Sequence, residues 1–287
     1  HGQGRLRGWA ELRKHRVVLA TINAKLQQLG LRGAAIAGGN EIPRTRFDRI
    51  DGLMRWQLVA GGWRLDAPRL RIGGQPRMQT LDGLVIAGGK QYALLADQVD
   101  AAPLLAVLGL SNRVDDGLRR WLAQAKPTAR LTGLSLTGRR GGAMRGQGRL
   151  SDVGFLPTGR APGLSGLAGD FRGDAEGFEL TLSPQSRMRF DWPSGFGKPH
   201  EVALHGKVAG WREGAGWRIG TSALRVQGKD YAADLRGGLW FQGDGTRPWI
   251  DIAADLDDAP VSAAKGFWVH HSMPKAANVW LNVALVR

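Results

Sequence analysis

Several residue types and patterns are missing from this chain of 287 residues, and each absence narrows what the protein can be. Cysteine is absent, which excludes a disulfide framework, a thiolate metal site and a cysteine nucleophile. No apolar run approaches the roughly 18 residues that a membrane-spanning helix needs. Acidic residues number only 25 against 40 Lys and Arg, so the net charge of +15 favours anionic partners such as phospholipid or lipopolysaccharide headgroups. Nucleic acid is disfavoured because the basic residues are spread along the chain rather than gathered in a run.

The two ends of the chain resemble cuts in a longer protein. The first residue is His1 rather than Met, and no signal peptide opens the sequence. The last segment, Trp280 to Arg287, stops soon after its helical pattern begins. We therefore expect a fragment whose membrane anchor or signal lies outside it.

Alternation with a period of two dominates the chain and predicts a mainly β fold. Ile250 and Ile252 alternate with Asp251, and Leu224 and Val226 flank Arg225, so each segment has one apolar and one polar face. Forty-three glycines separate these runs at short intervals, as at 61–62, 88–89 and 214–216. The pattern predicts a long antiparallel meander that curls into a repeating β-groove.

Two helical segments interrupt the strands, at about 102–125 and 260–284. The first opens with Asp100-Ala-Ala-Pro103 and the second with Asp257-Asp258-Ala-Pro260, which is typical of a helix start: Asp caps the free N–H groups, and Pro stands where a missing N–H has no cost. The first segment is expected to break near Ser111 into two short helices.

An internal repeat links the two halves of the sequence. Trp63-Arg64-Leu65 and the following Leu70-Arg71-Ile72 match Trp217-Arg218-Ile219 and Leu224-Arg225-Val226, each position displaced by 154 residues. An Asp-Pro start and a later Trp-Leu pair recur in the same order at displacements of 157 to 159 residues. We divide the chain into a first repeat at 1–130 and a second at 131–287, which form one continuous array rather than independent domains.

Motifs for catalysis, cofactors and metals are incomplete. Lys90 follows two glycines, but Gln91 replaces the Ser or Thr of a nucleotide-binding loop, and Ser165 lacks a nucleophile-elbow pattern. His270 and His271 have no partner at a metal-binding spacing. Asp255, Asp257 and Asp258 are better explained as an outward strand face and a helix cap than as a metal cluster. We expect no enzyme activity, no cofactor and no metal.

A family resemblance rests on several motifs in the second half of the chain. In order along the sequence they are Leu-Ser-Asp-Val-Gly-Phe at Leu150 to Phe155, the glycine-rich stretch Pro162 to Gly169, Gly216-Trp217 with Leu224-Arg225-Val226, Asp258-Ala259-Pro260, and Met273-Pro274 before Trp280-Leu281. This order resembles the YhdP family of AsmA-like proteins. The resemblance is best from about Leu150 to Val286, and the first half fits as the preceding repeat without a counterpart of Pro162 to Gly169.

The resemblance implies a function that composition alone does not give. Similar proteins belong to the envelope of double-membraned bacteria, have an N-terminal membrane helix, and carry a long periplasmic β-groove implicated in moving phospholipid toward the outer membrane. The expected location is therefore a periplasmic segment of an inner-membrane-anchored protein. Phospholipid is the expected partner, together with envelope membrane proteins outside this segment. The family has no catalytic signature.

A sheet with one apolar face that curls without closing would form a trough for lipid tails. The candidates for its lining are the apolar residues of the clearest strands: Leu70, Ile72, Leu180, Leu182, Leu224, Val226, Ile250 and Ile252. Each is equally compatible with an ordinary buried core position. Trp63 and Trp217 are expected to pack at a turn or strand edge rather than to touch lipid.

Two other functions stay open at this point. One is a non-enzymatic envelope scaffold or interaction protein with a filled β core. The other is a basic β-rich polyanion binder, which would need clustered Arg and exposed aromatics on one outer face.

Overall fold

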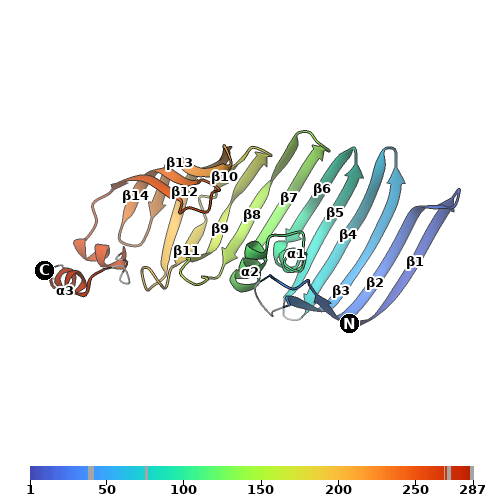
Figure 1. Ribbon diagram of the computed structural model, residues 1–287, viewed down its shortest axis with the longest axis horizontal. Coiled ribbons are helices and arrows are strands. Elements are labelled where there is room, and N and C mark those ends of the chain that lie inside the picture. The colour runs from blue at the N-terminus through green and yellow to red at the C-terminus, as the bar shows by residue number, and fades with distance from the viewer. Residues whose placement is uncertain (38–41, 75–76, 268, 270–272, 285–287) are drawn as a thin grey trace. The chain divides into compact units, whose positions relative to one another are not determined.

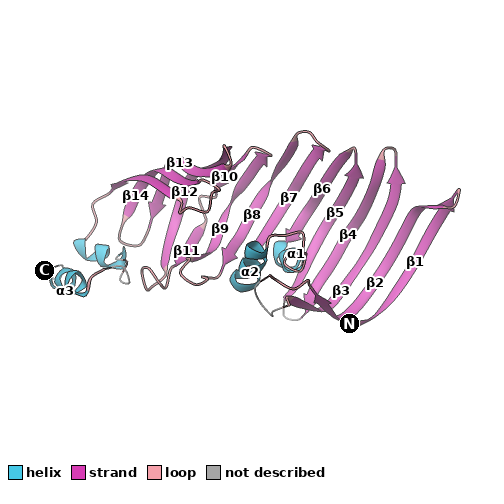
Figure 2. Ribbon diagram, viewed as in Figure 1, coloured by secondary structure: helices cyan, strands magenta, loops and turns pink. Residues whose placement is uncertain are grey.

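The computed structural model describes residues 1–37, 42–74, 77–267, 269 and 273–284. In this part of the chain the dominant element is an antiparallel sheet of fifteen strands (Figure 2). Strand order follows the sequence, except that β11 (Arg187–Asp191) pairs with β9 and β12 beside β10. The prediction of a mainly β, antiparallel fold is confirmed.

The chain divides into two compact units, residues 1–150 and 151–287. The boundary predicted from the repeats, between 130 and 131, lies inside β7. Unit 1 contains β1 (Gln3–Arg13), β2 (Arg16–Arg32), β3 (Arg44–Val59), β4 (Gly62–Gly74), β5 (Arg77–Gly89), β6 (Gln91–Asp100), α1 (Ala101–Leu108), α2 (Asp116–Ala125), β7 (Thr128–Arg139) and the start of β8 (Met144–Phe155). Unit 2 contains the end of β8, β9 (Gly163–Asp174), β10 (Gly177–Leu182), β11, β12 (His200–Glu213), β13 (Gly216–Gln227), β14 (Ala232–Phe241), β15 (Trp249–Leu256), η1 (Val261–Phe267) and α3 (Lys275–Ala284).

The sequence repeat corresponds to a repeated order of strands. Trp63 is the second residue of β4 and Trp217 is the second residue of β13, and each strand follows a tight turn. Gly61 (φ 78°) and Gly214 (φ 62°) occupy left-handed conformations in these turns, which a residue with a Cβ adopts only at a cost. Each half then continues through further hairpins into a helical segment.

The first helical segment is broken as predicted, into α1 and α2, and α1 packs against β7 and α2 (Figure 1). The expected role of Asp100 as a helix cap is wrong. Its carboxylate accepts a hydrogen bond from the Thr80 backbone N–H on β5 (3.3 Å) and forms an ion pair with Arg130 on β7 (3.5 Å). These contacts to the two neighbouring strands take the place of a bond to the helix N-terminus. Asp115 caps α2 instead, accepting from the N–H groups of Gly117 and Leu118.

The second helical segment contains a 3-10 helix, η1, followed by α3. Of the residues between them, His270 and His271 lie outside the described part of the chain.

Arg119 joins the helix pair to the segment that follows β2. Its side chain is only 1% exposed and donates to the carbonyl oxygens of Gly109 (3.2 Å), Ala34 (2.5 Å) and Ala35 (3.3 Å), and to Asp116 (2.7 Å). A buried guanidinium is tolerated only when its donors are satisfied in this way. The pKa of Asp116 is held below its ordinary value of 3.8, first by the backbone N–H of Ala37 and then by Arg119.

Candidate functional site: an apolar sheet face with filled and open parts

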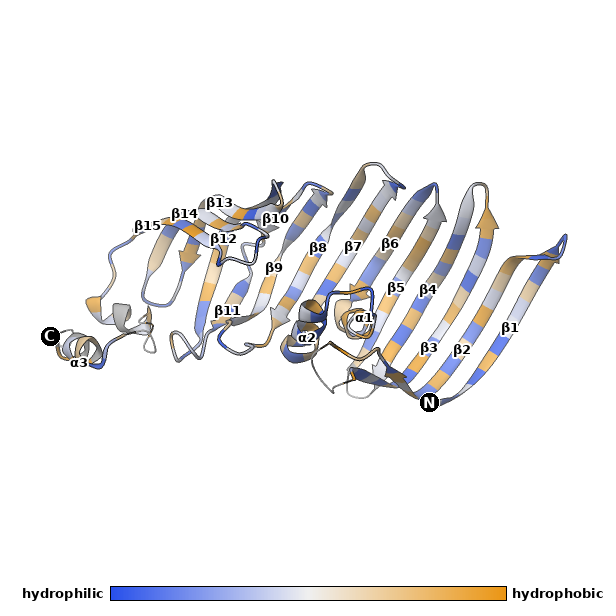
Figure 3. Cartoon of the chain, in the orientation of Figure 1, coloured by the Kyte–Doolittle hydropathy of each residue, from blue (hydrophilic) through white to orange (hydrophobic). Residues whose placement is uncertain are grey.

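Alternation along the strands gives each unit one apolar face and one polar face. Figure 3 shows apolar and polar residues following one another along the strands. The strand register places the apolar residues of neighbouring strands opposite each other, as in Leu70 with Leu81 and Leu81 with Val99. We call the sides that carry these residues the apolar faces.

The apolar face of unit 1 is filled near one end of its strands. Phe47, Ile72, Leu81, Ala96 and Val99 form a buried cluster in which Leu81 is 0% exposed. Partly buried apolar residues from β2 to β7 pack around it: Leu31, Ile50, Leu70, Leu84, Leu131 and Leu134. This part of the face is an ordinary hydrophobic core.

Toward the opposite end of the same strands, the apolar face of unit 1 is open. Leu58 is 46% exposed, Trp63, its partner on β4, is 36% exposed, and Ile22 on β2 is 41% exposed. The ring of Trp63 lies over Gly88, where a Cβ would come within 2.6 Å of it. Trp63 therefore packs beside a turn, as expected, and still presents a third of its surface to solvent.

The apolar face of unit 2 has the same division. Leu182, Val202 and Leu204 form its buried cluster, and the partly buried residues that pack against it are Leu167, Leu180, Met188, Val208, Leu224, Val226 and Tyr231. The open part consists of Phe178 (40% exposed), Trp217 (37%), Phe241 (40%), Ile250 (65%) and Ile252 (54%). The rings of Phe178 and Trp217 lie 6.5 Å apart, and Trp217 is paired with Phe241 on the next strand.

The eight predicted lining residues separate into two groups. Leu70, Ile72, Leu180, Leu182, Leu224 and Val226 belong to the filled clusters, whereas Ile250 and Ile252 are exposed. Sequence reasoning missed the aromatic members of the open part. The sequence signal that points to them is the recurrence of Trp63 and Trp217, for which packing at a turn or strand edge is the expected role.

Exposed cations lie in the turns beside the open part of unit 1. Lys14 lies in the turn between β1 and β2, and Arg16 begins β2. Lys90 lies in the turn between β5 and β6, Arg139 ends β7, and Arg140 follows it. These turns lie at the same end of the strands as Leu58 and Trp63. Positive charge therefore borders the exposed apolar surface.

The polar faces of both units carry several ion pairs. In unit 1, Arg64 pairs with Asp66 (2.7 Å). In unit 2, Lys207 (3.2 Å) and Arg172 (2.9 Å) donate to Glu179, and they hold the pKa of its carboxyl below the ordinary value, with the hydrogen bond from Lys207 as the largest cause.

Arg225 forms a second ion-pair group in unit 2. It pairs with Asp234 (2.8 Å) and with Asp257, and its hydrogen bond is the main reason that the pKa of Asp257 is lowered. Asp255 faces Arg236 at 4.0 Å. Asp255 and Asp257 therefore each pair with an arginine side chain. The described residues contain no group of three or more His, Asp or Glu that could hold a metal ion.

No helix in the described part of the chain is long and apolar enough to cross a membrane. The extended sheet with a partly open apolar face defines the class: a β-sheet repeat protein whose surface, rather than an enclosed pocket, presents its apolar groups. A family model described as YhdP protein matches residues 1–287, so the chain belongs to the YhdP family. No curated protein and no solved structure matches the chain.

Proposed function

We propose that this chain is a periplasmic, non-enzymatic segment of an inner-membrane-anchored envelope protein that conducts phospholipid between the inner and outer membranes. The observation that carries the proposal is the open part of each apolar face, where large apolar and aromatic side chains stay 36% to 65% exposed. Soluble proteins rarely leave such groups exposed side by side unless they bind an apolar partner. Membership of the YhdP family supports the same function.

The energetics suit passage along a surface. Moving an acyl tail of about 15 methylenes through water costs on the order of 12 kcal/mol, at about 0.8 kcal/mol for each group. Apolar contacts are non-directional, so a continuous apolar surface lowers this cost without creating one position where the lipid is trapped. The filled clusters lie farther along the same strands and hold them firmly in place beside the surface on which the tails lie.

The turn cations of unit 1 suit the other end of the lipid. A tail lying against Leu58 and Trp63 would bring its phosphate toward the turns that carry Lys14, Arg16, Lys90, Arg139 and Arg140. Lys and Arg near a lipid surface attract anionic headgroups by about 1 kcal/mol each, and salt weakens the attraction.

A scaffold function is the second candidate, because the filled clusters are what it predicts. A scaffold would use the exposed apolar residues to contact other envelope proteins. The two functions differ in the phospholipid bound to the purified chain: a conduit should retain it on the open apolar face, and a scaffold should not.

The test is to express the 287-residue chain in the periplasm of a double-membraned bacterium, purify it in mild detergent and measure its bound phospholipid by mass spectrometry. Phe241→Asp with Ile250→Asp places charge on the open part of unit 2. Trp249→Asp is the matched control, because Trp249 precedes Ile250 on β15, faces the other way and is 68% exposed.

We expect phospholipid to survive a high-salt wash in the unmodified chain and in Trp249→Asp, and to fall several-fold in the double variant. Lipid that washes off with salt in every variant, or that is unaffected by the double variant, would refute transport along this face and favour the scaffold.

A further inference from the structure

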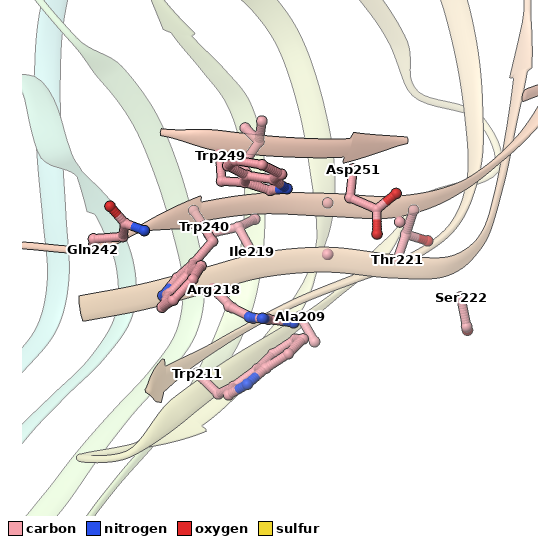
Figure 4. Close-up of a pocket in the computed structure, with 14 residues that line it drawn as sticks. Ala209, Trp211, Arg218, Ile219, Thr221, Ser222, Trp240, Gln242, Trp249 and Asp251 are labelled. Atoms are coloured by element: carbon pink, nitrogen blue, oxygen red, sulfur yellow. The ribbon is translucent and has the colours of Figure 1, made fainter. Parts of the chain in front are cut away.

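The polar face of unit 2 contains a hollow that the lipid function does not use. Figure 4 shows the side chains that line it, which come mainly from β12 to β15 and include Trp211, Trp240 and Trp249. Its volume is about 740 Å³, within the range of small-molecule binding sites. Asp251 and Ser222 also line it. The hollow is therefore lined by three tryptophans and lies on the face opposite Trp217, Phe241 and Ile250.

The aromatic wall follows from the strand register. Trp211 is paired with Arg218, Arg218 with Trp240, and Trp240 with Trp249, so four side chains form one row across four strands. The guanidinium of Arg218 lies 5.1 Å from the ring centre of Trp240. Trp211 and Trp249, at the two ends, are 42% and 68% exposed. At a strand spacing of about 4.8 Å, the row spans roughly 14 Å.

Beside this row the sheet has almost no side chains. The next row contains Ala209, Gly220 and Gly238, paired in that order on β12, β13 and β14, and ends at Asp251 on β15. A Cβ on Gly238 would come within 2.2 Å of the Ile219 carbonyl oxygen, so glycine is required there. The bare backbone leaves a flat floor against the tryptophan wall.

The charges around the hollow are balanced except for one carboxylate. Arg218 pairs with Glu213, so its charge is compensated within the protein. Among the described residues no cation pairs with Asp251, which stands at the end of the floor as an available hydrogen-bond acceptor. Ser222 adds a hydroxyl that both donates and accepts.

We propose that this hollow binds a neutral saccharide chain of pyranose units. A pyranose has a flat face of C–H groups and a rim of hydroxyls. The C–H face can lie on the negative face of an indole ring, while the rim can reach the carboxylate and hydroxyl that border the floor. An extended row of rings over a flat floor suits a linear chain with equatorial hydroxyls. The proposal does not rest on lipid transport, because the site lies on the opposite face.

Other ligand classes fit the site less well. A quaternary ammonium group favours several rings that enclose it, but Arg218 already covers Trp240 and the two exposed rings, Trp211 and Trp249, stand at opposite ends of the row. Single-stranded nucleic acid stacks on aromatics, but its phosphates would lie beside the unpaired carboxylate of Asp251, and the one cation among the described lining residues, Arg218, is already paired with Glu213. An acyl tail cannot hydrogen-bond the Asp251 carboxylate or the Ser222 hydroxyl at the edge of the floor. Covering these groups without giving them a partner would weaken its binding.

The test is isothermal titration calorimetry of the purified 287-residue chain with cellohexaose and chitohexaose. Trp249→Ala and Trp211→Ala remove the two ends of the wall, and each is expected to weaken binding by roughly tenfold. Ile250→Ala is the matched control, because Ile250 is the next residue on β15, is similarly exposed and faces the other side. Gly220→Ala adds a methyl group to the floor, 3.0 Å from the Gly237 carbonyl oxygen and 3.7 Å from the Trp211 ring, and should also weaken binding.

Binding of either oligosaccharide that is insensitive to salt, weakened by both Trp variants and unchanged in Ile250→Ala supports the proposal. Circular dichroism of each variant checks that a loss of binding is not a loss of fold. Failure of both oligosaccharides to bind at millimolar concentration overturns it. Binding that the Trp variants leave unchanged also overturns it. In a parallel titration with an oligothymidylate, binding that is tighter than that of either oligosaccharide and that weakens with salt overturns it as well.

Discussion

The division of one apolar face into a filled and an open part makes a sharp prediction for two leucines of unit 1. Leu81 is fully buried among Phe47, Ile72 and Val99, whereas Leu58 on the same face is 46% exposed. Leu81→Ala removes apolar groups worth about 2 kcal/mol in transfer, and the cavity left in a stiff sheet adds about 1 kcal/mol more. Leu58→Ala should cost less than about 1 kcal/mol, because half of its surface gains nothing from burial.

Hydrogen exchange measured by mass spectrometry suits this comparison, since a repeat sheet does not unfold in a single step. Peptides from β4 to β6 should lose protection equivalent to about 3 kcal/mol in Leu81→Ala and stay close to the unmodified chain in Leu58→Ala. Equal losses in the two variants would refute the reasoning, because the open part would then be as tightly packed as the filled part.

Two further predictions concern polar contacts. Arg119→Met keeps the apolar bulk but leaves the Ala34, Ala35 and Gly109 carbonyls without their donor. It should lower the stability of this region by about 3 kcal/mol and expose the segment 33–37 and α2 to limited proteolysis. Unchanged cleavage would contradict this. Because the pKa of Asp257 is lowered in the folded chain, its contribution to stability is complete above the ordinary value of 3.8 and is lost as pH falls through the folded pKa. The melting temperature of Asp257→Asn should therefore lie below that of the unmodified chain at neutral pH and converge with it in acid; a constant difference would argue against the ion pair with Arg225.

The sequence was sufficient for the strands and their faces because alternation is a local property. Leu70 and Ile72 point to one side of β4 whatever surrounds the strand, and their repeat counterparts Leu224 and Val226 do the same. Whether such a residue is covered depends on its position along the strand and on whether the strand has neighbours on both sides; β15 is the last strand in the sheet order, and all of its residues are exposed. Ile250 and Leu224 therefore have the same pattern in sequence but different exposure in the structure.

Local signals failed where a distant partner competed for the same group. Asp100 precedes a helix in the manner of a cap, yet Thr80 and Arg130 from neighbouring strands take its carboxylate. The tryptophan row of unit 2 was hidden for a related reason. Trp211 and Trp249 are 38 residues apart in sequence, and only the register of β12 to β15, which includes irregular steps in the pairing, brings them into one row.

The same alternation constrains how the two faces can work together. Trp249 and Ile250 are neighbours on β15, and the strand directs one toward the proposed saccharide site and the other toward the proposed lipid surface. A one-residue slip of this strand would exchange the two residues and damage both surfaces at once. Gly237, on β14, resists a slip that would put its neighbour Arg236 in its place against β15, because a Cβ at Gly237 would come within 2.0 Å of the Asp251 carbonyl oxygen. Register in this part of the sheet is therefore fixed by backbone contacts as well as by the burial of apolar groups, which allows an edge strand as exposed as β15 to hold distinct surfaces on its two sides.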